Sequence, residues 1–211
     1  MKKVMSLLLI LGMLFGLCGC NSSPKSNMTE MEKIQKQLNE MESYQCTATM
    51  KRISNKGENT YETKQYFKST GEYRLELTAP ETVAGNYTVF DGEKICQYNP
   101  RIEGKIVKKV PESQQRNELF LGQFVKNYMQ SEGVSVDAAA MDESQCTVLE
   151  AVIPGKDANL STEKLWVDSK TLKPVQFIIY NQKGNERYIL NYKDFEYNPN
   201  LKGELFTIKE D

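Results

Sequence analysis

Apolar and polar residues alternate with a period of two along most of the chain. The segment 44–51, for example, reads YQCTATMK, with apolar side chains at every second position. Such alternation is typical of a half-buried β-strand, because successive side chains of a strand point to opposite faces. The sequence predicts ten strands of this kind, at 44–51, 60–68, 73–77, 87–90, 94–98, 106–110, 145–153, 164–167, 175–180 and 186–197. Turn-forming residues separate them, so we expect antiparallel strands in meander order.

One of these turns has a specific prediction. Asp91-Gly92 lies between the strands at 87–90 and 94–98. Asp-Gly tolerates the positive φ angles of a two-residue type I′ turn, which joins the strands of tight hairpins. The sequence therefore predicts a hairpin with a type I′ turn at this point.

Two segments depart from the period of two and are predicted to be helices. In 28–42, apolar residues recur at spacings of three and four, at Met28, Met31, Ile34, Leu38 and Met41. Asn27 and Glu30, three residues apart, resemble a capping box. In 118–130, Leu121, Val125 and Tyr128 share a face, and Gly133 is a natural stop. We interpret the first helix as packed on the chain's own sheet, with an adaptable methionine-rich binding face as the alternative.

These elements predict a mainly β (α+β) fold. We expect a large curved antiparallel sheet, or incomplete β-barrel, with the helices against its concave face. The predicted elements and the absence of repeats indicate a single domain from 28 to 211.

The N-terminus has the features of a lipoprotein signal. Two lysines precede an apolar run that is shorter than the ~20 residues needed to span a membrane. The run ends in Leu17-Cys18-Gly19-Cys20, which resembles a bacterial lipobox, although Cys18 stands where Ala, Ser or Thr is commoner. We expect residues 1–19 to be removed, Cys20 to carry the lipid and residues 20–27 to form a tether. A simple secreted protein or a retained apolar helix is the alternative.

Charge and composition exclude several function classes. The 27 basic and 28 acidic residues nearly balance, which gives no reason to expect a nucleic-acid partner. The chain has no histidine, which removes Ser-His-Asp and Cys-His nucleophile activation and most catalytic zinc sites. No metal or cofactor motif is present, so we predict no catalytic, cofactor-binding or metal-binding residue. A hydrolase with paired carboxylates survives this test.

Cysteine and aromatic residues of the body are interpreted as structural. Three cysteines lie in the expected domain, at Cys46, Cys96 and Cys146. We interpret them as small buried side chains, with one disulfide as the alternative. Trp166, the only tryptophan, is predicted to lie in the core. Four tyrosines near the C-terminus fall on alternating strand positions, and some of their rings are expected to be exposed: Tyr180, Tyr188, Tyr192 and Tyr197.

Two stretches resemble a known superfamily. They are EYRLELTAPETVAGNYTVFDGEKICQYNP at 72–100 and EKLWVDSKTLKPVQFIIYNQKGNERYILNYKDFEYNPNLKGELF at 163–206. The ordered series of short motifs is similar to the outer-membrane lipoprotein carriers LolA and LolB and their Gram-positive relatives. The resemblance implies an incomplete antiparallel barrel that holds helices against its concave side. The soluble carriers of that superfamily have no lipid anchor, so an anchor at Cys20 sets this chain apart from them.

Within the superfamily, the signal, the lipobox and the size most resemble the germination lipoproteins of anaerobic endospore formers. That resemblance implies a non-enzymatic protein that binds and activates a cortex N-acetylmuramoyl-L-alanine amidase of the CwlD type. The amidase would then make the muramic-δ-lactam of the spore cortex. The implied location is extracytoplasmic and lipid-anchored, in the space around the forespore. An unpaired edge strand would accept a strand from the amidase, or allow a homodimer by strand exchange.

An anchored lipid- or lipoprotein-binding module of the LolB kind is the alternative. It requires an apolar cavity between the sheet and the helices, for which the sequence offers Leu75, Leu77, Phe120, Phe124, Trp166 and Phe177. A filled core is the competing interpretation of these six residues.

Overall fold

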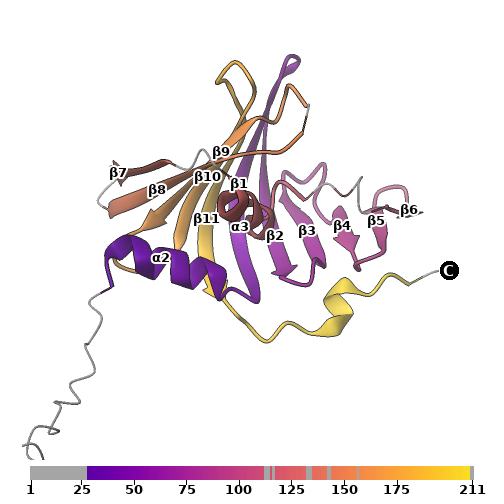
Figure 1. Cartoon of the computed structure of the whole chain (residues 1–211). Helices are drawn as coiled ribbons and strands as arrows, with labels where there is room; N and C mark the ends of the chain where they lie inside the picture. The colour runs from indigo at the N-terminus through magenta and orange to yellow at the C-terminus, as the bar shows by residue number, and fades with distance from the viewer. Residues whose placement is uncertain are drawn as a thin grey trace, which may run out of the picture.

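The fold is one open antiparallel sheet with two helices against one of its faces (Figure 1). The computed structural model describes residues 28–111, 115, 117–131, 135–141, 144–155 and 157–209, with only the backbone at 135 and 136. Eleven strands are hydrogen-bonded in the order β6-β5-β4-β3-β2-β1-β11-β10-β9-β8-β7. The predicted fold class is therefore confirmed.

The sheet consists of two meanders. The first contains β1 (Ser43–Ser54), β2 (Gly57–Lys68), β3 (Tyr73–Ala79), β4 (Tyr87–Phe90), β5 (Lys94–Asn99) and β6 (Gly104–Lys109). The second contains β7 (Ser135–Met141), β8 (Ser144–Val152), β9 (Thr162–Asp168), β10 (Pro174–Tyr180) and β11 (Glu186–Tyr197). Ten strands were predicted, and β7 was missed because its run of three alanines and one aspartate has little β-propensity.

The first and last strands join the two meanders. Strand β1 pairs with β11 from Tyr44 opposite Tyr197 to Arg52 opposite Tyr188, with an irregularity between Gln45 and Thr47. The predicted meander order is therefore wrong at this point, because β1 and β11 are neighbours in the sheet although they are the first and last strands of the chain. Because β1 and β11 meet in the middle, β6 and β7 become the two edges of the sheet.

The predicted hairpin at Asp91-Gly92 forms, but its turn is different. The Asp91 N–H donates to the Lys94 carbonyl at 3.1 Å, so Gly92 and Glu93 are the central residues of the turn. Of these two only Gly92 has a positive φ angle, 101°, whereas a type I′ turn needs positive φ at both central positions. The side-chain Oδ1 of Asp91 instead accepts the N–H groups of Glu93 and Lys94, at 2.9 and 2.7 Å. Asp91 thus closes the turn through its carboxylate.

Helix α2 (Glu30–Asn39) is capped by a different residue from the one predicted. Thr29 is the N-cap, and it shares a reciprocal capping box with Glu32. Glu30 was predicted to complete a box with Asn27, which lies outside the described residues. The Glu30 carboxylate instead accepts hydrogen bonds from the hydroxyls of Ser169 and Thr147, which hold its pKa below its ordinary value. These contacts tie the start of α2 to strand β8 and to the turn after β9.

Helix α3 (Leu121–Gln130) is held in place by close backbone and side-chain contacts. The Leu121 N–H donates to the buried Tyr44 hydroxyl at 3.3 Å, and that hydroxyl donates to Gln65 at 3.1 Å. Gly122 allows the helix to approach the sheet, because an ideal Cβ at this position would lie 1.9 Å from a ring carbon of Phe67. Gly133, the predicted helix stop, lies outside the described residues.

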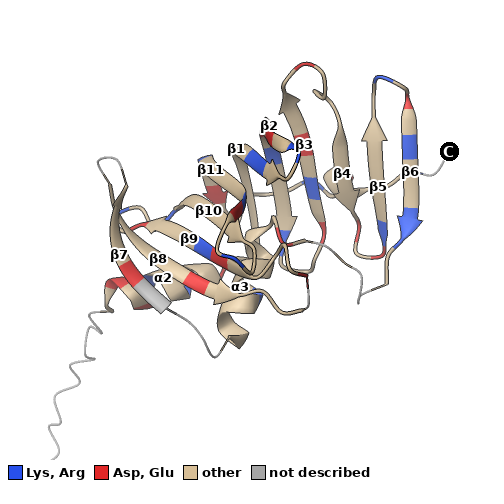
Figure 2. Ribbon diagram, turned by 90° about the horizontal axis from the view of Figure 1, so that it is seen from above, with Lys and Arg blue, Asp and Glu red and all other residues tan. Residues whose placement is uncertain are grey.

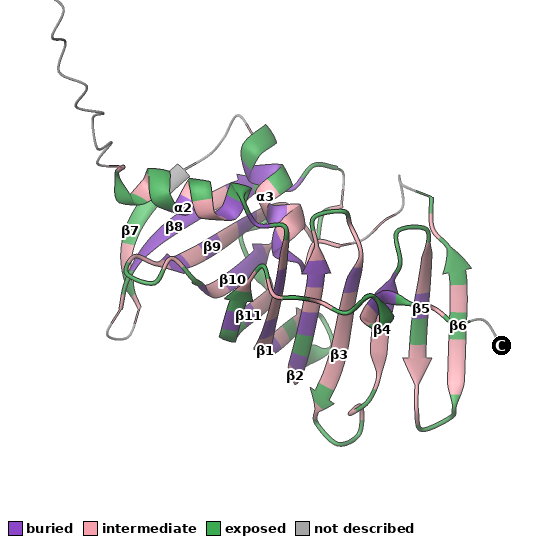
Figure 3. Cartoon of the chain, turned by 90° about the horizontal axis from the view of Figure 1, so that it is seen from below, coloured by how far each residue is buried: buried purple, intermediate pink, exposed green. Residues whose placement is uncertain are grey.

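The core lies between the helices and the inner face of the sheet. Ile34 and Leu38 of α2 are buried, as are Leu121 and Phe124 of α3, which confirms the interpretation of the first helix as packed on its own sheet. Burial of each such side chain stabilises the fold by about 1.5–3 kcal/mol. The helices lie over β7–β11 and β1, whereas β3–β6 carry no helix (Figure 3).

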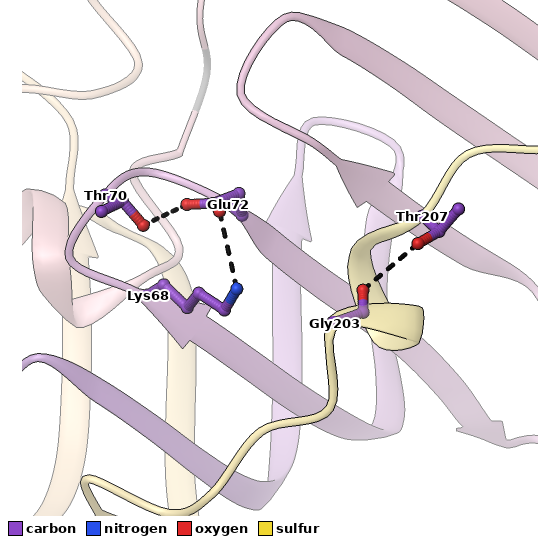
Figure 4. A network of polar contacts seen from close by, with 5 residues as sticks. All are labelled: Lys68, Thr70, Glu72, Gly203 and Thr207. Atoms are coloured by element: carbon purple, nitrogen blue, oxygen red, sulfur yellow. Dashed lines mark hydrogen bonds and ion pairs between the residues drawn. The ribbon is translucent and has the colours of Figure 1, made fainter.

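The C-terminal segment covers part of the outer face. After β11 it runs below strands β1–β4 towards β6 (Figure 3) and forms a short 3-10 helix, η2 (Gly203–Phe206). Phe206 is buried, and the Lys68 ammonium lies 4.6 Å from its ring centroid. Lys68 also pairs with Glu72 at 3.6 Å, beside η2 (Figure 4). The segment thus adds a small second cluster to the face opposite the helices.

Candidate functional site

An apolar groove of about 560 Å³ lies on the inner face of the sheet, over the strands that carry no helix. Its walls come mainly from the first meander, from β11 and from the residues before α3. Its apolar lining includes Met50, Tyr61, Leu75, Leu77, Leu119 and Tyr188. Five of these, all except Met50, are only partly buried and rest against the core. The groove is therefore an open extension of the core surface.

Exposed apolar side chains mark the rim of this groove. Ile102 is 75% exposed and Ile106 is 55% exposed, and both line the groove near β6. Arg52, which is also exposed, supplies a cation to the lining. An apolar surface left uncovered in this way is typical of a site that binds a partner or a ligand.

The predicted cavity residues divide into three groups. Leu75 and Leu77 line the groove, which lies over strands that carry no helix and not between the sheet and the helices as the cavity alternative required. The phenylalanines do not line it, because they are buried in the core under and beside α3: Phe120, Phe124 and Phe177. Trp166 is only half-buried and is not part of the inner core, so its predicted core position is wrong. It alternates with the buried Leu165 and Val167 and so points to the outer face.

A second, smaller hollow of about 260 Å³ lies beside the same edge of the sheet. Its apolar lining comes from Tyr73, Phe90, Ile95 and Val110, and its lysines are Lys108 and Lys109 of β6. Strand β6 therefore borders two hollows, the groove at its N-terminal half and this lysine-edged hollow at its C-terminal half.

A buried carboxyl group lies under α3. Glu163 of β9 is 0% exposed, and its Oε1 accepts a hydrogen bond of 2.8 Å from the Asn127 side chain. Burial raises the pKa of Glu163 to about 8, against the opposing effect of that hydrogen bond. Its Oε2 has no hydrogen-bond partner among the described residues. The side chain does not line the groove.

Sequence reasoning missed Glu163 and Asn127. The signal was present for Glu163, because it shares strand parity with Leu165 and Val167 and must point to the core face with them. No comparable signal marked Asn127, whose role depends on where α3 packs.

The other predicted residues have mixed outcomes. Cys46, Cys96 and Cys146 are buried, which confirms their interpretation as small buried side chains, and none of the three forms a disulfide with another described cysteine. Tyr192 is buried, whereas Tyr180, Tyr188 and Tyr197 are half-buried. Cys20, the predicted lipid site, lies outside the described residues, as do residues 1–19.

The described residues contain no group of three or more His, Cys, Asp or Glu side chains placed to hold a metal ion. Within the same residues, no helix has the length and apolar character needed to cross a membrane. The groove, the smaller hollow and the β6 edge together form the candidate site.

A family model described as sporulation protein YdcC-like matches residues 2–206 of the chain. No curated protein matches the sequence.

Several solved structures are similar. An uncharacterized conserved protein from Thermus thermophilus has a TM-score of 0.54 at 15% identity, over 87% of this chain and 96% of that one. The GerS lipoprotein complex with the CwlD amidase from Clostridioides difficile has a TM-score of 0.49 at 30% identity, over 82% of this chain and 99% of that one. A LolA superfamily protein from Nitrosomonas europaea has a TM-score of 0.44 at 15% identity, over 86% and 99%. At 15% identity, the likeness to the Thermus thermophilus protein shows the fold alone.

Proposed function

Since the chain belongs to the YdcC-like sporulation protein family, we propose that it is a non-enzymatic lipoprotein needed for spore germination. In this proposal it binds and activates a cortex N-acetylmuramoyl-L-alanine amidase of the CwlD type, so that muramic-δ-lactam is made in the spore cortex. The choice of partner is motivated by the 30% sequence identity with the GerS comparison, a complex with the CwlD amidase.

The proposal includes an anchor outside the cytoplasm. Residues 1–19 are removed, Cys20 receives the lipid, residues 20–27 form the tether and 28–211 form the single domain. Two acyl chains hold a protein stably on a membrane, at about 0.8 kcal/mol per buried methylene. The protein then faces the space around the forespore, where a cortex amidase acts.

The surface chemistry supports a binding role. The uncovered groove and the β6 edge present apolar and cationic groups, and the strongly buried acid Glu163 is enclosed under α3. A binding protein activates an enzyme by a higher affinity for the active state than for the inactive one. The proposed partner belongs to a zinc-dependent class of enzyme, and this chain has no histidine to supply to its zinc ion, so the activation acts through the fold of the partner.

A reconstitution experiment tests this proposal. Residues 21–211 are mixed with the amidase, and complex formation, zinc content and cleavage of the muramoyl-alanine bond are measured with and without the lipoprotein. We expect a stable complex and increased cleavage. A folded amidase that neither binds nor responds would refute the proposal.

Self-association is a separate part of the proposal. The two sheet edges, β6 and β7, would allow a homodimer by strand exchange. Light scattering on residues 21–211 measures the mass directly. A monomer at every concentration, with and without the amidase, would contradict the dimer.

A lipid- or lipoprotein-binding module is the second candidate. The observation in its favour is the groove of about 560 Å³, which is lined by Leu75 and Leu77 and has the Arg52 cation beside it. Native mass spectrometry of the protein purified from membranes would show a bound acyl chain. A Leu77→Lys variant should lose that ligand, and a ligand-free wild-type protein would count against this candidate.

A further inference from the structure

We propose that the outer edge of β6 binds an extended segment of a partner protein in which apolar and acidic residues alternate. The segment would add a twelfth strand to the sheet, beside the two hollows described above. This inference names the docking surface for the proposed function and rests on it only for the identity of the partner.

The backbone groups of β6 point alternately towards β5 and away from the sheet. Val110, just after β6, donates its N–H to the Glu93 carbonyl at 3.0 Å. Hydrogen-bonded pairs alternate along an antiparallel ladder, and the β5–β6 register has no irregularity. Ile106 and Lys108 therefore bond to β5, and Val107 and Lys109 direct their N–H and C=O groups away from the sheet. No other described strand pairs with that side.

The inner side of the β6 edge presents an exposed apolar surface. Ile106 points to the inner face, where it and Ile102 are the two most exposed large hydrophobic residues of the described chain. An added strand would place every second side chain on this same face. Apolar side chains at those positions would cover Ile106 and reach the groove on one side and the smaller hollow on the other.

Strand β6 is positively charged. It has the sequence GKIVKK, with three lysines and no acidic residue, and its basic positions are the blue bands on the ribbon of β6 at the edge of the sheet (Figure 2). Lys108 is exposed and borders the smaller hollow. Lys109 pairs with Glu93 at 2.6 Å, but its side chain is still 74% exposed. Acidic residues in the added strand would neutralise these lysines, whereas a basic strand would be repelled.

The opposite edge lacks these features. Strand β7 reads SVDAAAM, with one acidic residue, no basic residue and three alanines. It therefore offers little side-chain surface and a charge of the opposite sign. Of the two edges, β6 has the apolar, cationic and backbone groups that recognise a strand of this composition.

The test uses a labelled probe peptide in which valine alternates with glutamate, and a matched peptide with lysine in place of glutamate. Fluorescence anisotropy at low salt measures the binding of each peptide to residues 21–211. We expect the acidic peptide to bind and the basic one not to bind. Lys108→Glu should weaken the binding of the acidic peptide about fivefold, since an attractive cross-strand pair becomes repulsive. The control Lys64→Glu changes an exposed lysine on β2, which has a paired strand on each side.

Amide hydrogen exchange distinguishes strand addition from binding over the hollows. With the acidic peptide bound, the N–H groups of Val107 and Lys109 should become protected, and those of Ile106 and Lys108 should change little. Val107→Pro removes one outward donor and should abolish binding while circular dichroism stays unchanged, because edge strands tolerate proline at such positions. Peptide binding without protection of Val107 would overturn the inference.

The outcomes separate this inference from the proposed function. If the acidic peptide binds as a strand but the amidase does not bind, the edge inference holds and the partner is wrong. If the amidase binds equally to wild type, Lys108→Glu and Val107→Pro, the edge inference is overturned and the function is not. A change of mass in light scattering for Val107→Pro would assign the edge to a second copy, which also overturns it.

Discussion

The ionisation of Glu163 should make the stability of this protein depend on pH. Its carboxyl is 0% exposed and its pKa is raised to about 8, from an ordinary value of 4.5. The folded state thus holds the proton more tightly than the unfolded state. The resulting stabilisation is complete below pH 4.5 and is lost as the pH rises through about 8.

The magnitude follows from the gap between the two pKa values. At about 1.4 kcal/mol per pH unit, the full gap corresponds to about 5 kcal/mol. Between pH 6 and pH 8.5 the linkage relation gives a loss of about 2.5 kcal/mol. Glu163→Gln removes the titrating group and keeps an acceptor for Asn127. We therefore expect the stability of Glu163→Gln, relative to wild type, to rise by this amount over that range.

The assay is urea unfolding followed by the fluorescence of Trp166, the only tryptophan. The difference between wild type and variant is the relevant quantity, because other groups titrate equally in both. Glu150→Gln is the matched control, since Glu150 lies on the neighbouring strand β8 and pairs with Lys164 at 3.1 Å. If wild type and Glu163→Gln lose stability in parallel between pH 6 and pH 8.5, the buried carboxyl is not the titrating group and the reasoning is wrong.

Three further predictions follow from single positions. Gly122→Ala should destabilise the fold by about 1–3 kcal/mol, because its Cβ would lie 1.9 Å from a Phe67 ring carbon; Gly203→Ala, which meets nothing within 4 Å, is the control. A similar unfolding free energy for both variants would show that α3 can shift. Phe206→Ala removes a buried ring, and should speed protease cleavage in the C-terminal segment while the core stays protected. Cys20→Ala should move the protein from the detergent phase to the aqueous phase in phase partition, and retention in detergent would refute the lipid anchor.

The pattern of the fold could be predicted because strand periodicity is local. Alternation placed Cys46, Ala48 and Met50 on one face, and all three are buried there. The same rule assigns Trp166 to the outer face and Glu163 to the inner face, as observed. The general preference of tryptophan for the core and of glutamate for the surface favours the opposite assignment. For these two residues strand parity was the better guide, since neighbours in a strand must point to opposite faces.

The sequence by itself determined ten of the eleven strands of the sheet, helices α2 and α3 and the apolar inner face, because each depends on residues close together in the chain. Only the tertiary structure decided that β1 pairs with β11, since that pairing brings together residues more than 130 positions apart, such as Arg52 and Tyr188. That pairing leaves β6 and β7 as edges and confines the helices to one half of the inner face. The groove and the position of the basic strand β6 at an edge follow from this long-range arrangement, which no local pattern encodes.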